Sequence, residues 1–167
     1  MQIHRRISRM FAAATVVMVA AGALAALAIA APEQTRESYV AQVEPICKTN
    51  TKANERILSG VEKKVKEGKL KVAAGQFTQA AGAFEKAVKQ IRAVPQPVAD
   101  QAKLTKWLSY LNEETKLLGQ IGKALKAGNK SKAQTLSVRL THNGNLANNA
   151  VLGFEFNYCL IDSSRFS

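Results

Sequence analysis

The chain has 167 residues, of which 47% are apolar and 22% are charged, and its formal net charge is +12. This length and composition predict one domain with its own hydrophobic core and exclude a disordered chain. The strongly positive balance is compatible with an anionic partner or surface.

The first 31 residues have the pattern of a targeting or membrane segment. The opening MQIHRRISR carries three arginines and no acid, and an uncharged run of 22 residues follows from Met10 to Ala31. A run of this length reaches the ~20 residues of a membrane span, which favours a retained anchor. The small residues Ala28 and Ala30 form the A-x-A pattern of a signal-peptidase site, which favours cleavage after about Ala30. Both interpretations stay open at this point.

Either interpretation places the rest of the chain outside the cytoplasm. Arginines before the apolar run hold the N-terminus in the cytoplasm, so residues 32–167 are expected to be exported and either secreted or anchored. This exported part has 21 basic and 12 acidic residues, a net charge of +9, because the N-terminal segment contains three of the arginines and no acid. No cysteine ends the apolar run, so a site for a lipid-modified N-terminus is missing.

The chain has two cysteines, Cys47 and Cys159, one near each end of the exported part. An oxidising compartment would join them, and the alternative is two separate buried thiols. Their spacing is not that of a C-x-x-C redox or zinc motif, so the expected bridge is structural. By closing a loop of over a hundred residues, it would contribute about 4 kcal/mol in the chain-entropy model.

Apolar residues recur at steps of three and four from residue 35 onward, which predicts four amphipathic helices and no strand. The expected helices span 36–67, 69–94, 98–127 and 131–154, with stops at Gly68, at PQP and at AGN. Pro45 predicts a kink in the first helix, or a start near Glu44. Ser131 is the expected cap of the fourth helix, whose middle, NGNLANN, is poor in helix formers.

Four long helices with short connections predict an all-α fold, an antiparallel four-helix bundle with up-down-up-down topology. In that topology the start of the first helix lies beside the end of the fourth, which makes a bond between Cys47 and Cys159 geometrically sensible. Asn50, Thr115 and Asn143 fall on the apolar seams. They are either polar residues that set the register or the lining of a small polar pocket between helices.

Four stretches that follow one another between residues 39 and 159 are YVAQVEPICKTN, VPQPVADQAKLTKWLSYL, ALKAGNKSKAQTL and LGFEFNYC. In order and spacing they resemble an uncharacterised group of exported bacterial helical proteins, common in actinobacteria, with one cysteine near each end of the exported domain. The resemblance implies a helical extracytoplasmic domain with no assigned activity, so no catalytic residue carries over. Many members of that group look like lipoproteins, and this chain differs by lacking the lipid-attachment cysteine.

The exported part lacks the residue patterns of common catalytic and metal sites. His142 is its one histidine, and Glu-x-x-His, C-x-x-C-H, nucleophile-elbow and Gly-rich phosphate-binding motifs are absent. It contains no methionine, which excludes a Met-lined groove. Glu113 and Glu114 diverge by about 100° on a helix, so they are expected on a solvated face rather than as an acid/base pair. We therefore expect no catalytic residue, metal ligand or cofactor; an enzyme of unrecognised type is the alternative.

Lysines gather around the two expected turns at Gly68 and Gly128, which share one end of an up-down-up-down bundle. This end would hold nine lysines against Glu62 and Glu67, a net charge of +7, while the opposite end is near neutral. The nine are Lys63, Lys64, Lys66, Lys69, Lys71, Lys123, Lys126, Lys130 and Lys132.

These lysines allow two interpretations. They keep helix ends solvated, or they form an anion-binding surface for cell-envelope polymers or a lipid surface. The second predicts a non-catalytic, envelope-associated binding or structural protein, with residues 10–31 in the membrane if they are not cleaved. Nucleic acid is a further candidate partner that the charge permits, but export and a single tryptophan, Trp107, without a recognition motif count against it.

Overall fold

The structure, a computed structural model, describes residues 34–162, all within the unit Pro32–Ser167. The expected targeting or anchor segment, residues 1–31, lies outside the described residues. Between residues 34 and 162 the fold is all-helical and contains no strand, which confirms the predicted class. The elements of this part are α1 (Arg36–Leu58), α2 (Val61–Lys66), α3 (Leu70–Ala93), the 3-10 turn η1 (Val98–Asp100), α4 (Gln101–Lys126) and α5 (Lys130–Ala150).

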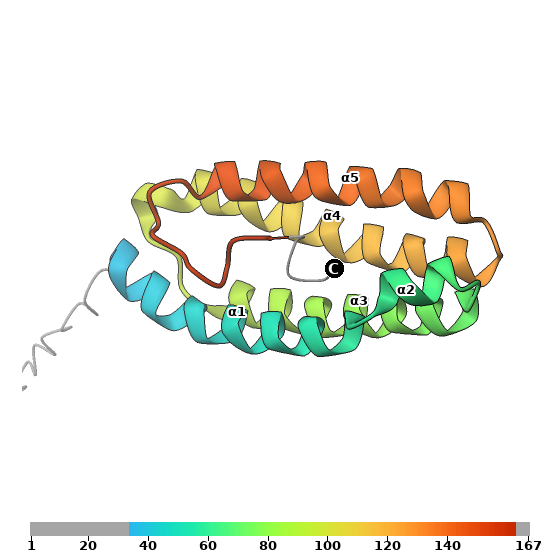
Figure 1. Cartoon of the computed structure of the whole chain (residues 1–167). Helices are drawn as coiled ribbons and strands as arrows, with labels where there is room; N and C mark the ends of the chain where they lie inside the picture. The colour runs from blue at the N-terminus through green and yellow to red at the C-terminus, as the bar shows by residue number, and fades with distance from the viewer. Residues whose placement is uncertain (1–33, 163–167) are drawn as a thin grey trace, which may run out of the picture. The chain divides into compact units, whose positions relative to one another are not determined.

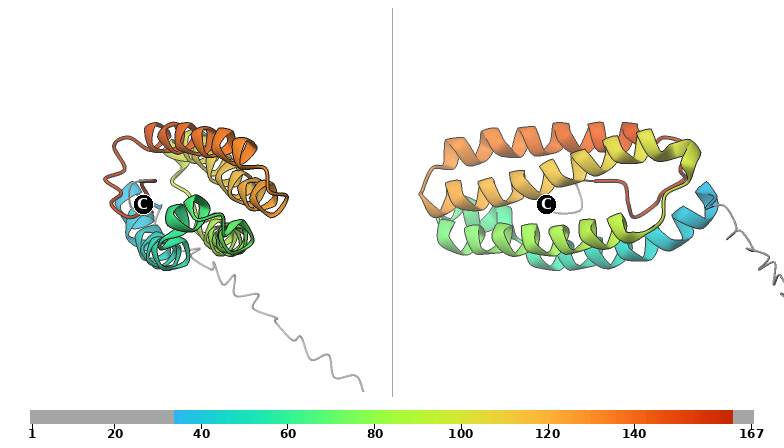
Figure 2. Two further views of the ribbon diagram at one scale, coloured as in Figure 1. Left: turned by 45° about the vertical axis from the view of Figure 1, so that its right-hand side comes forward. Right: turned by 180° about the vertical axis from the view of Figure 1, so that it is seen from behind.

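The four long helices pack in chain order, except that the short α2 lies between α1 and α3. Helix α3 contacts both α1 and α4, and α4 contacts α5. Figure 1 shows successive long helices running in opposite directions, with α1 and α3 on one side and α4 and α5 on the other. The views in Figure 2 show the same two pairs. None of the helices within residues 34–162 combines the length and the apolar character that a membrane span requires.

The first expected helix is interrupted, so its predicted span of 36–67 was wrong. Helix α1 ends at Leu58, and Gly60 adopts a left-handed φ of 64° before α2 begins at Val61. Glycine takes this conformation without the steric cost that a Cβ would add. The apolar spacing continues through Val61 and Val65, which is why periodicity alone did not reveal the break.

Helix α1 includes Pro45 and does not start near Glu44. It begins at Arg36 because Thr35 caps it through a reciprocal pair of hydrogen bonds with Ser38. In Figure 1 the N-terminal turns of α1, drawn in blue, incline away from the rest of the helix, as the predicted proline kink requires.

The other helix ends differ from the predictions by a few residues. Gly68 and Gly128, with φ of 77° and 75°, occupy the two turns as expected. Asn129, not Ser131, caps α5: its Oδ1 accepts a hydrogen bond from the amide of Lys132 at 2.9 Å. Helix α5 ends at Ala150 rather than at 154, so the predicted fourth helix was too long.

The residues after α5 (151–162), which we call the C-terminal segment, turn back and run between α1 and α5 (Figure 1). The side-chain amide of Asn148 in α5 binds the backbone of the segment at Ile161. Its Nδ2 donates to the Ile161 carbonyl at 2.9 Å, and its Oδ1 accepts from the Ile161 backbone amide at 2.8 Å. On the opposite side, Thr51 donates to the carbonyl of Tyr158 at 3.2 Å. The segment therefore occupies the seam where the first and fourth helices were expected to meet directly.

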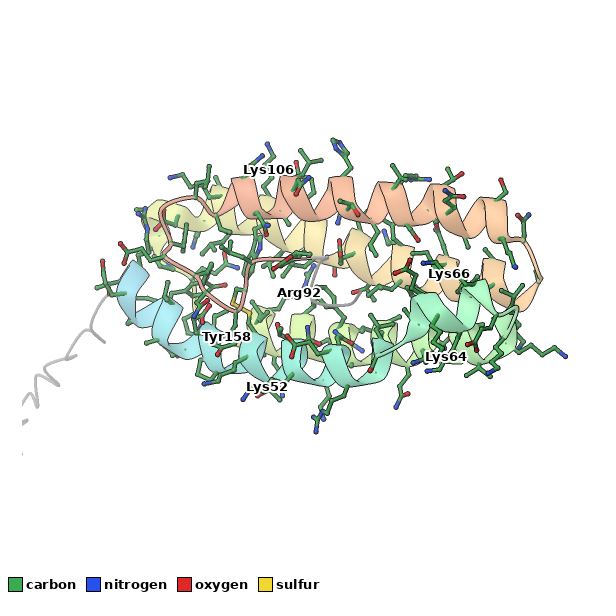
Figure 3. The ribbon with its side chains drawn as sticks, viewed as in Figure 1. Lys52, Lys64, Lys66, Arg92, Lys106 and Tyr158 are labelled. Atoms are coloured by element: carbon green, nitrogen blue, oxygen red, sulfur yellow. A yellow bond between two sulfur atoms is a disulfide. The ribbon has the colours of Figure 1, made fainter. Side chains whose placement is uncertain are left out.

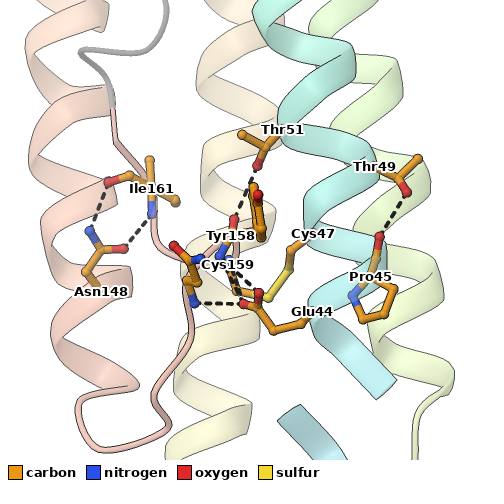
Figure 4. Close-up of a disulfide and its surroundings, with 10 residues drawn as sticks. Glu44, Pro45, Cys47, Thr49, Thr51, Asn148, Tyr158, Cys159 and Ile161 are labelled. Atoms are coloured by element: carbon orange, nitrogen blue, oxygen red, sulfur yellow. Dashed lines mark hydrogen bonds between the residues drawn. A yellow bond between two sulfur atoms is a disulfide. The ribbon is translucent and has the colours of Figure 1, made fainter. Parts of the chain in front are cut away.

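The predicted disulfide is confirmed and fastens this segment to α1. Cys47 is bonded to Cys159 with a Cα–Cα separation of 5.0 Å (Figure 4). Beside it, the carboxylate of Glu44 accepts hydrogen bonds from three successive backbone amides, those of Asn157, Tyr158 and Cys159, at 2.9 to 3.2 Å. Cys159 thus lies beyond the last helix, and the bridge joins the segment, rather than α5, to α1.

Aromatic residues of the C-terminal segment complete the core at the end where the chain enters α1. Phe156 stacks on Trp107 with ring centroids 5.3 Å apart, and Phe154 meets Tyr39 edge to face at 6.4 Å. A second cluster of buried residues around Leu117, Ile121 and Leu125 fills the opposite end. The core is thus divided into two clusters along the bundle.

Candidate functional site

The two lysine-bearing turns lie side by side. A surface hollow is lined by both turns, among them Gly68 and Lys71 from the first and Lys126 and Gly128 from the second. Figure 3 shows Lys64 and Lys66 on α2 at this end of the bundle, with Lys52 and Lys106 closer to the other end. We call the surface of the nine predicted lysines the lysine-rich end.

Most of these lysines are exposed, and few of them are neutralised. Lys63 and Lys69 pair with Glu67 at 3.9 and 2.8 Å, and Lys66 pairs with Glu62. Within residues 34–162, six members of the lysine-rich end form no ion pair. These six are Lys64, Lys71, Lys123, Lys126, Lys130 and Lys132, of which all but the half-buried Lys64 are exposed.

Two helix N-termini, of α3 and α5, and two helix C-termini, of α2 and α4, meet at this end, so their dipoles offset one another overall and act on individual lysines. Helices α3 and α5 begin here, with no acidic residue in either first turn. Lys71 lies in the first turn of α3, and Lys130 and Lys132 lie in that of α5. A cation near a helix N-terminus is unfavourable by about 0.3 to 1 kcal/mol, whereas Lys123 and Lys126 in the last turn of α4 are favourably placed. Lys63, Lys64 and Lys66 are likewise favourably placed in the last turn of α2. Helix stability therefore explains the lysines of α2 and α4 but not those of α3 and α5.

A second feature, which the sequence analysis did not identify, is a central cavity of about 280 Å³. Its wall comes from α1, α2, α3, α4, α5 and the C-terminal segment, and it is mainly apolar. Phe84 and Leu140 contribute from opposite sides, and the Cys47–Cys159 bridge forms part of the wall. The segment that the disulfide fastens is thus also a wall of the cavity.

Two buried polar side chains in this wall have unused hydrogen-bonding atoms. Trp107 is 0% exposed and Asn54 is 4% exposed. The indole Nε1 of Trp107 and the Oδ1 of Asn54 have no hydrogen-bond partner among the described residues, although the Nδ2 of Asn54 donates to Asn50 at 3.1 Å. An unmade hydrogen bond at a buried polar group costs about 1 to 3 kcal/mol, so a polar partner within reach of either atom would stabilise it.

Glu114 also lines the cavity, which corrects the prediction that it lies on a solvated face. Its side chain is 5% exposed, and its Oε2 accepts a hydrogen bond from Nδ2 of Asn143 at 2.7 Å. Burial raises the pKa of Glu114 to about 7, although the bond from Asn143 acts in the opposite direction. Its neighbour Glu113 follows the prediction better: it is partly exposed and lies within 4 Å of Lys116 and Arg139.

The three polar seam residues have different positions. Asn50 lines the cavity, whereas Asn143 lies behind Glu114 and orients its carboxyl group. Thr115 is half-buried and donates its hydroxyl to the carbonyl of Leu111 in its own helix at 3.2 Å. Of the three, Asn50 lines the mainly apolar cavity, Asn143 contributes through Glu114, and Thr115 is not part of the wall.

Spacing could have revealed Glu114, because Leu111, Glu114 and Leu118 are separated by three and four residues and so share one face of α4.

Within residues 34–162, no group of three or more His, Cys, Asp or Glu side chains is arranged to hold a metal ion. Comparisons of the chain with protein-family models, with curated proteins and with solved structures found no match.

Proposed function

We propose that this chain is an exported, non-catalytic envelope protein, an up-down-up-down bundle whose lysine-rich end binds anionic polymers of the cell envelope. The observation that carries the proposal is the shared hollow between the turns at Gly68 and Gly128. It joins two lysine groups that are separated in the sequence, with Glu62 and Glu67 as their acidic neighbours. The resemblance to exported helical proteins agrees with this location, and the disulfide agrees with an oxidising compartment.

Electrostatics supports a functional surface over simple solvation of the helix ends. Like charges within a Debye length of ~8 to 10 Å repel one another at physiological salt, so gathering them destabilises the fold slightly. Lys71, Lys130 and Lys132 increase this cost locally because they lie in the first turns of α3 and α5, although the C-termini of α2 and α4 at the same end offset the dipoles of these two helices. A polymer of regularly spaced phosphates or carboxylates would offset both the repulsion between the lysines and the unfavourable position of those near helix N-termini.

The bundle also separates this surface from the chain's entry point. Helix α4 has 26 residues, which corresponds to ~39 Å at ~1.5 Å per residue. At the far end Arg36 pairs with Asp100 at 2.7 Å, and its hydrogen bonds keep the pKa of that carboxyl below its usual range. Among residues 34–162, unpaired basic residues outside the lysine-rich end are spread along α1, α3 and α4, whereas those of the lysine-rich end gather around two adjacent turns.

The test compares two fourfold variants of equal charge, in protein purified from its own envelope. One carries Lys→Gln at residues 71, 126, 130 and 132, which belong to the lysine-rich end and lack ion pairs. The control carries Lys→Gln at the exposed residues 52, 86, 103 and 106, outside that end. Binding to poly(glycerol phosphate) is measured at low and at high salt, with neutral dextran, anionic vesicles and duplex DNA as comparisons.

The proposal predicts salt-sensitive binding to the polymer that the first variant weakens by about tenfold or more and the control by about twofold or less. A lysine at an anionic surface contributes up to about 1 kcal/mol, so four of them exceed the expected change. Equal weakening by both variants would show that binding depends on net charge alone, which would contradict a specific surface at the lysine-rich end. Unchanged binding in the first variant would leave the lysines as solvated helix ends, and a preference for DNA would favour the nucleic-acid alternative.

A further inference from the structure

The central cavity has the size and the composition of a small-molecule site. Its volume of about 280 Å³ is close to twice the ~150 Å³ of an apolar cavity that holds one benzene molecule. A ligand of roughly a dozen non-hydrogen atoms therefore fits it. Apolar side chains such as Phe84, Val88 and Leu140 provide most of the wall, which suits a hydrocarbon body.

The charged residues of the wall define which head group a ligand can carry. Glu114 and Asp162 line the cavity together with Glu62, whose charge is paired with Lys66, and none of the described lining residues is Lys, Arg or His. This contrasts with residues 32–167 as a whole, which have 21 basic and 12 acidic residues. An anionic head group would lie next to Glu114 and would meet no basic side chain among the described lining residues, which is costly in a buried site.

The unpartnered atoms of the lining residues favour a head group that both donates and accepts hydrogen bonds. Trp107 offers an indole N–H, which needs an acceptor, and Asn54 offers Oδ1, which needs a donor. Glu114 adds a carboxyl group that uses one oxygen for Asn143. A hydroxyl group matches the first two atoms, and an amine matches Asn54 and Glu114.

We propose that the central cavity binds a small apolar molecule with a neutral or cationic hydrogen-bonding head, of the alcohol or amine class. Its body lies among the apolar side chains, and its head lies near Asn54, Trp107 and Glu114. The C-terminal segment is one wall of this site through Tyr158 and Ile161, held there by the disulfide and by Asn148. The site shares Glu62 with the edge of the lysine-rich end but does not depend on the function proposed for that end.

Three probes with the same ten-carbon chain test the head-group rule in the full-length protein: 1-decanol, decylamine and decanoate. Affinity is measured by calorimetry at pH 8 and moderate salt, below the concentrations at which the probes aggregate. Trp107 is the one tryptophan of the chain and lines the cavity, so its fluorescence reports occupancy of this site and not adsorption to surface lysines. The expected result is that decanol and decylamine bind at least tenfold more tightly than decanoate and shift the emission.

Two pairs of variants locate the binding. Ser137 lines the cavity from α5 and is half-buried, so Ser137→Phe should fill the site and weaken all probes by tenfold or more. Ser109→Phe is the matched control, because Ser109 is exposed on α4 and bonds a backbone carbonyl of its own helix in the same way. Glu114→Gln should weaken decylamine by about tenfold and leave decanol within about twofold, whereas Glu113→Gln should change neither.

The proposal is overturned if no probe binds, if decanoate binds as tightly as decanol, or if Ser137→Phe binds all three as the parent does. Polymer binding measured on the same samples separates the two sites. Ser137→Phe should leave binding to poly(glycerol phosphate) unchanged, so failure of the cavity does not count against the lysine-rich end. Thermal unfolding of each variant shows that lost binding is not lost folding.

Discussion

Replacing Glu114 by Gln should change the way in which stability depends on pH. Burial raises the pKa of Glu114 from its usual 4.5 to about 7 in the folded protein. The folded chain therefore holds this proton at pH values where the unfolded chain has released it, and stability falls as pH rises from about 4.5 to about 7. A difference near 2.5 pKa units corresponds to about 3 kcal/mol, at about 1.4 kcal/mol per unit.

Glutamine has the same shape and keeps an oxygen for the bond from Asn143, but it never ionises. Near pH 4 the Glu114→Gln variant should match the parent, and at pH 8 it should be more stable by about 3 kcal/mol. Urea unfolding followed by circular dichroism at several pH values measures both quantities. Glu113→Gln is the control, because that partly exposed carboxyl should change the curve little. Parallel curves for the Glu114→Gln variant and the parent would refute the reasoning.

Two further changes test how the bundle is held. The double replacement Cys47→Ser and Cys159→Ser removes a bridge between residues 112 apart and should lower the free energy of unfolding by about 4 to 5 kcal/mol. It should also shift the emission of the tryptophan to longer wavelength. Unchanged stability would contradict a structural bridge. Gly122→Ala should lower the free energy of unfolding by about 1 to 3 kcal/mol, because the added Cβ would approach Oγ1 of Thr78 to 2.9 Å. Gly119→Ala is the control: open space surrounds this position, so the change should be neutral or stabilising. Equal effects of the two changes in thermal unfolding would contradict the close approach of α3 and α4.

Periodicity was sufficient to predict the helical class and most helix positions, because apolar faces dominate helix packing. It was not sufficient where the same spacing continues through a break. Val61 and Val65 continue the pattern of α1 beyond Gly60, and Phe154 continues that of α5, yet the chain turns at Gly60 and after Ala150. Both differences involve backbone conformations that apolar spacing does not encode.

The disulfide could be predicted because oxidation and bundle topology require only that two distant residues meet. The cavity could not, since it depends on how the C-terminal segment packs after the last helix. Glu114 was predicted to lie on a solvated face because it is charged and adjoins the partly exposed Glu113. Its place between Leu111 and Leu118 nevertheless favoured the apolar face, where it is buried. The seam residue Asn143 indicated a polar interior, but its partner was identified by the structure alone.

The central claim, that the lysine-rich end meets anionic polymers of the envelope, is tested most directly where the protein acts. A photo-cross-linking amino acid is placed at residue 71, in the lysine-rich end, or at residue 106, which is equally exposed near the other end. Both proteins are irradiated in intact cells, and the adducts are analysed by mass. The account predicts polymer adducts at residue 71 and few at residue 106. Adducts of equal yield at the two positions, or none at residue 71, would contradict it.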